Sequence, residues 1–311
     1  MMRRENPEAL DFKPLTLAHK QLVDEYMFKY GENSCQHSFA AMFCYKGKYG
    51  SSVREANGCL FVCRENLCCE KYRVYLMPMG GSDLAEAINA LLDDAHSRGK
   101  LVKLETVTGT AKSELEKYCP GMFEASEQRD SAEYIYTAEK LSNLPGKEMA
   151  SKRYDVNTFW RSYSSRAAIK EMTADLVEEV RGFQINWLKT RMRQEDKVQL
   201  KLENDAIMLG LDNFSSLRLS GILLYVDGVL RGYAYGALLS DNCYDVIIEK
   251  GDRDISDIYR ILNMELVRRC CEGLAFVNRE EDLGVPGLRK SKLSYKPDIL
   301  LKKYVLKETA R

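Results

Sequence analysis

Two groups of polar side chains lie where strands are predicted to end, and both could take part in chemistry. Glu249 follows the apolar run Val246-Ile247-Ile248. A carboxylate that is partly desolvated by apolar neighbours has its pKa moved toward a value useful for proton transfer, so Glu249 is a candidate general base. The structural alternative is an ion pair with Lys250 or with an arginine at the strand end.

The second group follows a predicted strand at residues 274–277. It consists of Asn278, Arg279, Glu280 and Asp282. Open α/β sheets bind their ligands at the carboxyl ends of strands, and a planar guanidinium can hold a phosphate or carboxylate through two hydrogen bonds. These side chains therefore form either a binding site or a buried polar network that ties the last strand to the sheet.

The number of cysteines suggests a metal site, but their spacing in the sequence argues against one. Six of the ten lie between residues 35 and 69, yet a structural zinc site needs paired ligands presented by a tight turn. Cys59 and Cys63 belong to an apolar strand, and alternate residues of a strand share a face without converging on an ion. We expect no metal and interpret the cysteines as reduced thiols that pack as small hydrophobes.

The elements that must position these residues occur in a repeated order. A strand, a glycine loop, an amphipathic helix and a second strand are predicted first at residues 72–104 and again at residues 244–277, with 21 residues from Gly80 to Leu101 and 23 from Gly251 to Leu274. In the first copy, Asp83 is a helix N-cap. We predict an α/β (α+β) protein with mixed sheets flanked by helices, duplicated as domains 1–146 and 147–311.

Composition and charge narrow the class of protein. The chain has 311 residues, 46 basic and 46 acidic side chains, and 45% hydrophobic content, which excludes disordered and low-complexity classes. The N-terminus has no signal-peptide pattern and no run approaches the length of a spanning helix, so we expect a cytoplasmic protein. Residues 1–146 carry 18 basic and 21 acidic groups, net −3, and the remainder carries 28 and 25, net +3.

Basic residues are concentrated near the C-terminus. Residues 289–307 contain seven basic side chains against Asp298 alone, net +6. Such a segment suits a tRNA acceptor stem or anionic lipid headgroups. The alternative is a solvated strand face, since Leu300, Leu301, Tyr304 and Leu306 have the pattern of strand packing.

The segment NREEDLGVPGLRKSKLSYKP, residues 278–297, resembles the C-terminal signature of the phosphatidylglycerol lysyltransferase C-terminal-domain family. Further matching pieces are Arg129-Asp130, Glu133-Tyr134, Lys152-Arg153 and Glu249-Lys250. This resemblance implies tandem GNAT-like folds related to the Fem-type aminoacyltransferases. It also implies a bacterial enzyme that moves an aminoacyl group from charged tRNA to an amine or hydroxyl acceptor, such as a lipid headgroup or a small molecule.

Three departures from the family pattern change what can be carried over. Tyr154-Asp155 stands where Asn-His is expected after Lys152-Arg153, and Ile247 stands where a histidine is usual. A histidine mechanism is therefore not transferred. Asp257 replaces a glycine in the loop that opens the second helix, which opposes binding of a coenzyme A pyrophosphate there. An acyl-CoA donor is thus disfavoured relative to an aminoacyl-tRNA.

The resemblance assigns roles within this site. Glu249 takes the role of base, Tyr295 is the candidate acid by its position in the motif, and the transfer proceeds by direct attack. The candidate substrate-binding residues are Lys152, Arg153, Lys250, Asn278, Arg279, Glu280, Asp282, Arg289 and Lys292. The alternative hypothesis is a catalytically degenerate GNAT-like module that binds a small anionic or peptide ligand.

Overall fold

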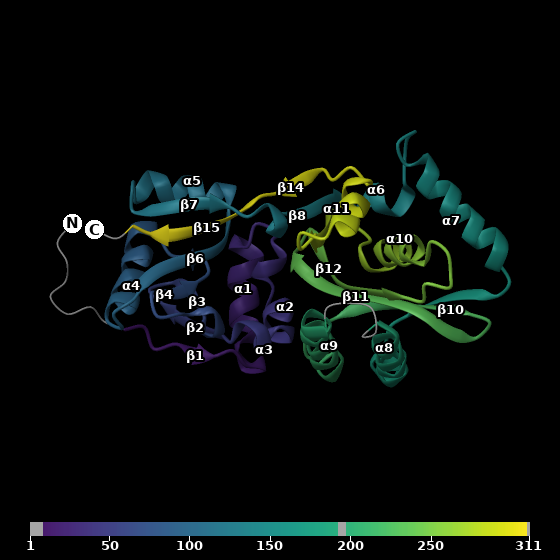
Figure 1. Ribbon diagram of the computed structural model, residues 1–311, viewed down its shortest axis with the longest axis horizontal. Helices are drawn as coiled ribbons and strands as arrows, with labels where there is room; N and C mark the ends of the chain where they lie inside the picture. Colours follow the sequence, from purple (N-terminus) through teal and green to yellow (C-terminus); the bar gives the residue numbers. More distant parts are fainter. Residues whose placement is uncertain (1–8, 192–196, 310–311) are drawn as a thin grey trace.

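The computed structural model describes residues 9–191 and 197–309, which form two mixed β-sheets flanked by helices (Figure 1). The sheets lie next to each other along the long axis of the molecule. The predicted fold class, α/β with mixed sheets flanked by helices, is confirmed. No helix in the described part of the chain is both long and apolar enough to cross a bilayer.

The spatial order of the strands differs from their order in the sequence. The first sheet contains, from one edge to the other, β1 (Lys13–Pro14), β2 (Ser51–Ala56), β3 (Cys59–Arg64), β4 (Tyr72–Tyr75), β6 (Leu101–Thr108), β15 (Lys303–Glu308) and β7 (Phe123–Glu127), with β5 (Met79–Gly80) paired to β3. The second contains β14 (Ile299–Leu301), β8 (Glu133–Thr137), β13 (Phe276–Glu281), β12 (Cys243–Gly251), β11 (Val229–Ser240), β10 (Ser220–Val226) and β9 (Ala167–Glu171).

The helices form layers on these sheets. On the second sheet, one face carries α6 (Ala138–Asn143), α7 (Ala150–Tyr163) and α10 (Ile258–Cys270), and the other carries α8 (Val177–Arg191) and α9 (Lys197–Asp212). The remaining helices are α1 (Lys20–Tyr30), α2 (Phe39–Cys44), α3 (Lys46–Tyr49), α4 (Leu84–His96), α5 (Gly109–Tyr118) and α11 (Pro286–Leu293). Short 3₁₀ helices are η1 (Leu17–His19), η2 (Cys35–His37), η3 (Glu65–Leu67), η4 (Arg129–Ser131) and η5 (Ala174–Leu176).

Local sequence signals explain several of these boundaries. Asp83 caps α4 by accepting hydrogen bonds from the backbone N–H groups of Ala85 and Glu86, as the sequence predicts. Asp227 and Gly228, at φ 54° and 75°, form the tight turn between β10 and β11, where a two-residue hairpin turn requires positive φ at both positions. These elements are set by the local sequence.

Both sheets have the same strand arrangement. Two antiparallel pairings lead to a strand, helix and parallel strand, which are β4, α4 and β6 in the first sheet and β12, α10 and β13 in the second. Two further antiparallel pairings follow in each sheet. This is the strand order expected of a duplicated unit.

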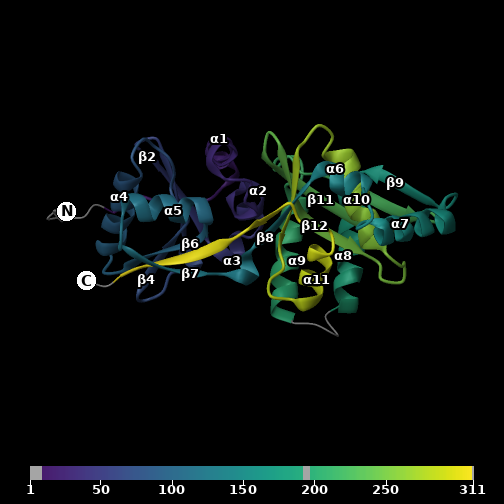
Figure 2. The ribbon, with the colours of Figure 1, turned by 90° about the horizontal axis from the view of Figure 1, so that it is seen from above.

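Each sheet contains one strand from the other half of the chain. β8 precedes residue 146 but lies in the second sheet, whereas β15, the last strand, lies between β6 and β7 of the first sheet (Figure 2). Glu133 and Lys303 begin these two strands and are joined by a fully buried ion pair, with 2.8 Å between Nζ and Oε1. The domain boundary at residue 146 stays a prediction. It concerns the segment that connects the two halves, because one strand from each half pairs within the sheet of the other half.

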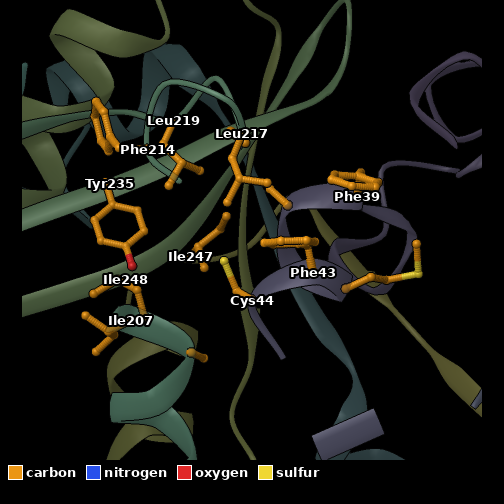
Figure 3. Packing of buried hydrophobic residues seen from close by; sticks show 14 of the residues in the cluster. Phe39, Phe43, Cys44, Ile207, Phe214, Leu217, Leu219, Tyr235, Ile247 and Ile248 are labelled. Atoms are coloured by element: carbon orange, nitrogen blue, oxygen red, sulfur yellow. The ribbon is translucent and has the colours of Figure 1, made fainter. Parts of the chain in front are cut away.

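The two halves also share an apolar core (Figure 3). Phe43 and Cys44 of α2 lie toward Ile247 of β12, and Phe39 of α2 and Ile207 of α9 belong to the same cluster. Burial of this surface joins α2 to the second sheet through the hydrophobic effect. The halves are therefore held by strand exchange and by a common core.

A β-bulge in β12 determines which side chains point to which face. Ile248 lies opposite Tyr235 but Val246 lies opposite Gly236, so Ile247 is an extra residue. A Cβ atom on Gly236 would lie 1.7 Å from the carbonyl oxygen of Asp245. The bulge therefore requires a glycine on the neighbouring strand.

We predict that Gly236→Ala lowers the free energy of unfolding by about 1–3 kcal/mol, the range for overpacking a core. Gly182→Ala is the control, because its Cβ would meet nothing within 4 Å in α8 and alanine favours helix by up to about 1 kcal/mol. Urea unfolding measures both. Equal stability of the two variants would contradict the close approach at the bulge.

We also predict that Lys303→Met destabilises the protein by about 3–5 kcal/mol, because it leaves Glu133 buried without its cation. Lys302→Met is the matched control, since Lys302 is 54% exposed and pairs with the exposed Glu127, an arrangement worth about 0–1 kcal/mol. Thermal unfolding measures the difference, and Glu133→Gln should restore part of the loss in Lys303→Met. Equal losses in the two lysine variants would show that the exchanged strands do not depend on this pair.

Candidate active site

The parallel strands β12 and β13 separate at their carboxyl ends. Their paired register runs from Cys243 and Phe276 only to Asp245 and Asn278, although β12 continues to Gly251 and β13 to Glu281. We call the region beyond the last paired residues the fork. The sequence predicts that the candidate residues follow these two strands, but the strands are longer than predicted. Glu249 lies within β12, and Arg279 and Glu280 lie within β13, at the unpaired strand ends that form the fork.

An ion pair bridges the fork on the face that carries α10. Oε2 of Glu249 and Nη2 of Arg279 lie 2.8 Å apart, and their side chains are 16% and 9% exposed. The other carboxylate oxygen, Oε1, and the Nε and Nη1 groups of Arg279 are buried without a hydrogen-bond partner among the described residues. The pair predicted as the structural alternative for Glu249 is thus formed, yet it leaves one acceptor and two donor groups available.

Tyr295 lies behind this pair. Its ring is 5.2 Å from the guanidinium carbon of Arg279 and 4.7 Å from Nζ of Lys152, and burial raises the pKa of its hydroxyl. Lys152 also donates a hydrogen bond to the carbonyl oxygen of Ser294, at 2.7 Å. These contacts bring three of the predicted site residues together with Glu249.

The second face of the fork is acidic. Asp245 is fully buried, and neither of its carboxylate oxygens has a hydrogen-bond partner in the part of the chain that the structure describes. Burial, then the charges of Glu133 and Glu281, raise the pKa of Asp245 well above its ordinary value. Burial and Asp245 likewise raise the pKa of Glu280. The charge of Lys292 offsets part of this repulsion, and a further cationic group placed on this face would relieve the rest.

Sequence reasoning missed Asp245. The signal that could have found it is a carboxylate inside the apolar run from Cys243 to Ile248, because an acidic residue is almost never buried without a partner. Glu281 was also missed, and it accepts hydrogen bonds from Nε2 of Gln36 at 3.0 Å and from the thiol of Cys35. The first half of the chain therefore contributes to this acidic face.

The bulge separates residues that the sequence groups together. Glu249 faces α10, whereas its neighbour Lys250 points to α8 and α9, where Nζ lies 2.7 Å from Glu203 and 4.4 Å from the ring centre of Trp187. Asn278 also lies away from Arg279. Its amide donates to Oε2 of Glu133 at 2.6 Å, so the structure does not bring Asn278 and Lys250 to the Glu249 side of the fork.

Asp282 and Arg289 form a saturated network instead of an open site. The buried carboxylate of Asp282 accepts hydrogen bonds from Arg129, Tyr134, the N–H of Gly284 and two nitrogens of Arg289. Burial alone would raise the pKa of Asp282, but these donors lower it. This pattern matches the predicted alternative of a network that ties the last strand to the sheet.

Lys292 and Arg153 are held by backbone oxygens. Nζ of Lys292 donates to the carbonyl groups of Arg279 and Glu281, and burial lowers its pKa. It therefore fixes the end of β13 beside the fork. Arg153 donates to the carbonyl groups of Leu144 and Gly146, which stabilises the connecting segment and not the fork.

The N-terminus of α10 is poorly suited to bind a phosphate group. Asp257 precedes the helix with φ 59° and makes no side-chain cap, while Arg260 donates to both Asp257 and Asp155. An anion bound at the helix N-terminus would meet these two carboxylates. This geometry opposes binding of a coenzyme A pyrophosphate at the start of α10, and the absence of an acyl-CoA donor stays a prediction.

Comparisons with known proteins fit this geometry. The family described as phosphatidylglycerol lysyltransferase, C-terminal, matches residues 28–307. An uncharacterized protein of Mycoplasmoides gallisepticum is 27% identical over 57% of this chain, a region that is 56% of that protein. The chain thus aligns with little more than half the length of this curated relative.

Solved structures resemble nearly the whole chain. A conserved protein of unknown function from Bacteroides thetaiotaomicron is 29% identical with a TM-score of 0.91, covering 96% of this chain and 100% of its own. L-PGS from Bacillus licheniformis (15% identity, TM-score 0.65, 94% and 92% coverage) and FemX (11%, 0.59, 95% and 97%) have the same fold. The resemblance predicted from the sequence is confirmed.

We predict that Asp245→Asn raises the melting temperature at pH 8, because a neutral amide avoids the cost of ionising a buried carboxyl group that has no hydrogen-bond donor among the described residues. The folded-state pKa of Asp245 is raised, so its contribution to stability is complete below the unfolded pKa of about 3.9 and is lost as pH rises through the folded value. The gain should therefore be smaller at pH 5 than at pH 8.

The control for this prediction is Asp241→Asn, which changes an exposed carboxylate in the turn between β11 and β12. It should leave the melting temperature unchanged at both pH values. Destabilisation by Asp245→Asn at pH 8 would show that the carboxylate has a stabilising partner and would remove the acidic face as a site.

Proposed function

The chain belongs to the family of the C-terminal domain of phosphatidylglycerol lysyltransferase, and from this premise we propose that it transfers an aminoacyl group. The donor is charged tRNA or a related activated amino acid, and the acceptor is an amine or hydroxyl, such as a lipid headgroup. Family and fold together support a GNAT-like aminoacyltransferase. The finer assignment of donor and acceptor rests on the fork.

The observation that carries the proposal is the opposite charge of the two faces of the fork. An activated aminoacyl group has an ammonium next to a polarised carbonyl. The carboxylates of Asp245 and Glu280, whose pKa values are raised, suit the ammonium, because a cation favours their charged forms. The Nε and Nη1 groups of Arg279, which have no hydrogen-bond partner among the described residues, suit the carbonyl oxygen.

The same atoms can serve the transfer reaction. The acceptor oxygen or nitrogen attacks the carbonyl carbon while Oε1 of Glu249, which is free of hydrogen bonds to described residues, removes its proton. Negative charge on the carbonyl oxygen is stabilised by Arg279. The bond from the carbonyl carbon to the donor oxygen then breaks, and Tyr295, protonated because its pKa is raised, returns a proton to that oxygen.

The C-terminal basic segment offers less charge to tRNA than its composition indicates. Lys303 is buried against Glu133, Lys292 is held by backbone carbonyl groups, and Arg289 binds Asp282 and Asp130. The side chains of Lys290, Lys296 and Lys307 are exposed, and that of Lys302 is exposed as well but pairs with Glu127. A tRNA contact at this segment therefore depends on these four lysines.

A binding module without turnover is the second candidate. It is favoured by the direct pairing of Glu249 with Arg279, because the ion pair already occupies one carboxylate oxygen and one nitrogen that a reaction would use. In this case the fork would hold a ligand without releasing a product. The variants Glu249→Gln and Arg279→Gln distinguish the enzyme from the binding module.

We predict that Glu249→Gln preserves donor binding and lowers transfer about 10²–10⁴-fold, the range for loss of a general base. Arg279→Gln should lower transfer about 10²–10³-fold, as for loss of an oxyanion donor. The control is Glu203→Gln, which removes the partner of Lys250 on the other face of β12 and should leave transfer unchanged.

The measurement combines native mass spectrometry and a transfer assay. Purified protein is offered lysyl-tRNA or acetyl-CoA, and transfer from lysyl-tRNA is followed to phosphatidylglycerol vesicles and to a soluble amine. Retention of a donor by wild type and Glu249→Gln without any transfer would favour the binding module. Consumption of acetyl-CoA in place of lysyl-tRNA would contradict the aminoacyl proposal.

A further inference from the structure

We propose that Cys63 and Cys68, in the first sheet, are a redox-active pair that hydrogen peroxide converts to a disulfide. Cys63 is the penultimate residue of β3, and Cys68 directly follows η3. Their sulfur atoms lie 4.0 Å apart. The short 3₁₀ helix between them turns the chain so that two cysteines five positions apart meet.

Their environments suit the two roles of a reactive and a resolving thiol. Cys68 is partly exposed and can be reached by a small oxidant, whereas Cys63 is buried beneath it. Cys69, the next residue, is exposed and accepts an N–H hydrogen bond from Tyr72. The pair therefore has an accessible member, a protected partner and a neighbouring cysteine for comparison.

The surroundings of Cys68 can hold its thiolate. The backbone N–H of Val74 donates to the Cys68 sulfur at 3.3 Å, and the Cys63 sulfur lies 4.0 Å away, where either thiol can donate. In its thiol form, Cys68 donates to the carbonyl oxygen of Arg64 at 3.5 Å. The Cys63 contact in particular lowers the pKa of Cys68 to about 6, with further help from the Val74 N–H and the Arg73 charge. Peroxide-sensitive cysteines have this combination of thiolate character and access.

The reaction balances with peroxide as the oxidant. The Cys68 thiolate attacks one peroxide oxygen, the O–O bond breaks, hydroxide leaves and a sulfenic acid forms on Cys68. The Cys63 sulfur then attacks the Cys68 sulfur, the S–S bond forms, and the sulfenic hydroxyl leaves with the Cys63 proton as water. Two thiols are oxidised, and one peroxide is reduced to two waters.

The site formed by Cys63 and Cys68 is less suited to binding a metal ion than to forming a disulfide. Glu65 lies near both sulfurs, but its two oxygens accept hydrogen bonds from Arg73 at 3.0 Å each, and one also accepts from Ser52. The Glu65 carboxylate is therefore already hydrogen-bonded, and the positive charge of Arg73 beside it would repel a metal ion. Two thiols remain, which suits disulfide chemistry more than a closed ion site.

Closing the bond moves a segment that is linked to the acidic face through Gln36. The sulfurs must approach from 4.0 Å to about 2.05 Å. Arg64 lies between the two cysteines and donates to Oε1 of Gln36 at 2.7 Å, and Gln36 in turn binds Glu281. The oxidised state is therefore connected to the fork through three side chains.

The test treats the full chain with near-stoichiometric hydrogen peroxide and maps tryptic peptides by mass spectrometry. Trypsin cuts after Arg64, so a Cys63–Cys68 disulfide joins residues 55–64 to residues 65–71. We expect this linked pair in wild type and in a Cys59→Ser, Cys69→Ser double variant, with loss of the link on reduction. Cys63→Ser should trap a dimedone-reactive sulfenic acid on Cys68.

Three results would overturn the proposal. The first is oxidation of Cys69 in preference to Cys68, with no link between the two peptides. The second is stoichiometric zinc in protein purified without added metal that Cys68→Ser removes, which would make the place a metal site. The third is a peroxide adduct on Cys63 in Cys68→Ser, which would reverse the two roles and contradict the assignment.

Discussion

The buried ion pair of Glu133 and Lys303 is the contact on which the arrangement of the two sheets depends. It joins the first residues of the two exchanged strands at 2.8 Å, where neither side chain meets solvent. Glu133 also accepts hydrogen bonds from Ser34, the N–H of Cys35 and Asn278. Burial alone would raise the pKa of Glu133, but Lys303 and these donors lower it, so the carboxylate is charged in the folded protein.

This network also fixes the position of the fork. Asn278, held by Glu133, is the last residue of β13 that pairs with β12, and Lys292 fixes the next turn of backbone through two carbonyl groups. Beyond Asn278, the end of β13 is therefore anchored to the crossing of the exchanged strands and not to β12. The bulge at Ile247 then places Asp245 and Glu249 on opposite faces, although residues four apart on a regular strand share one face.

Local pattern predicts the elements of the fork but not how they are joined. The repeated strand, helix and strand, the cap at Asp83 and the polar strand ends follow from short-range periodicity. The exchange of β8 and β15 does not, because it pairs segments at least 139 residues apart in sequence, the smallest separation being that of Thr137 and Phe276. The bulge likewise depends on the fit of Gly236 against Asp245, which no pattern within β12 records.

The contrast between two buried aspartates separates a structural role from a binding role. Asp282 accepts from two arginines, a tyrosine and a backbone N–H, so its charge is compensated within the fold. Asp245 is equally buried and has no hydrogen-bond donor among the described residues. Because an uncompensated buried carboxylate opposes folding, a fold that retains one gains from it elsewhere. A cationic ligand would therefore be stabilised by binding at the Asp245 face of the fork. The Asp282 network, whose hydrogen bonds are all made within the fold, holds α11 beside the fork.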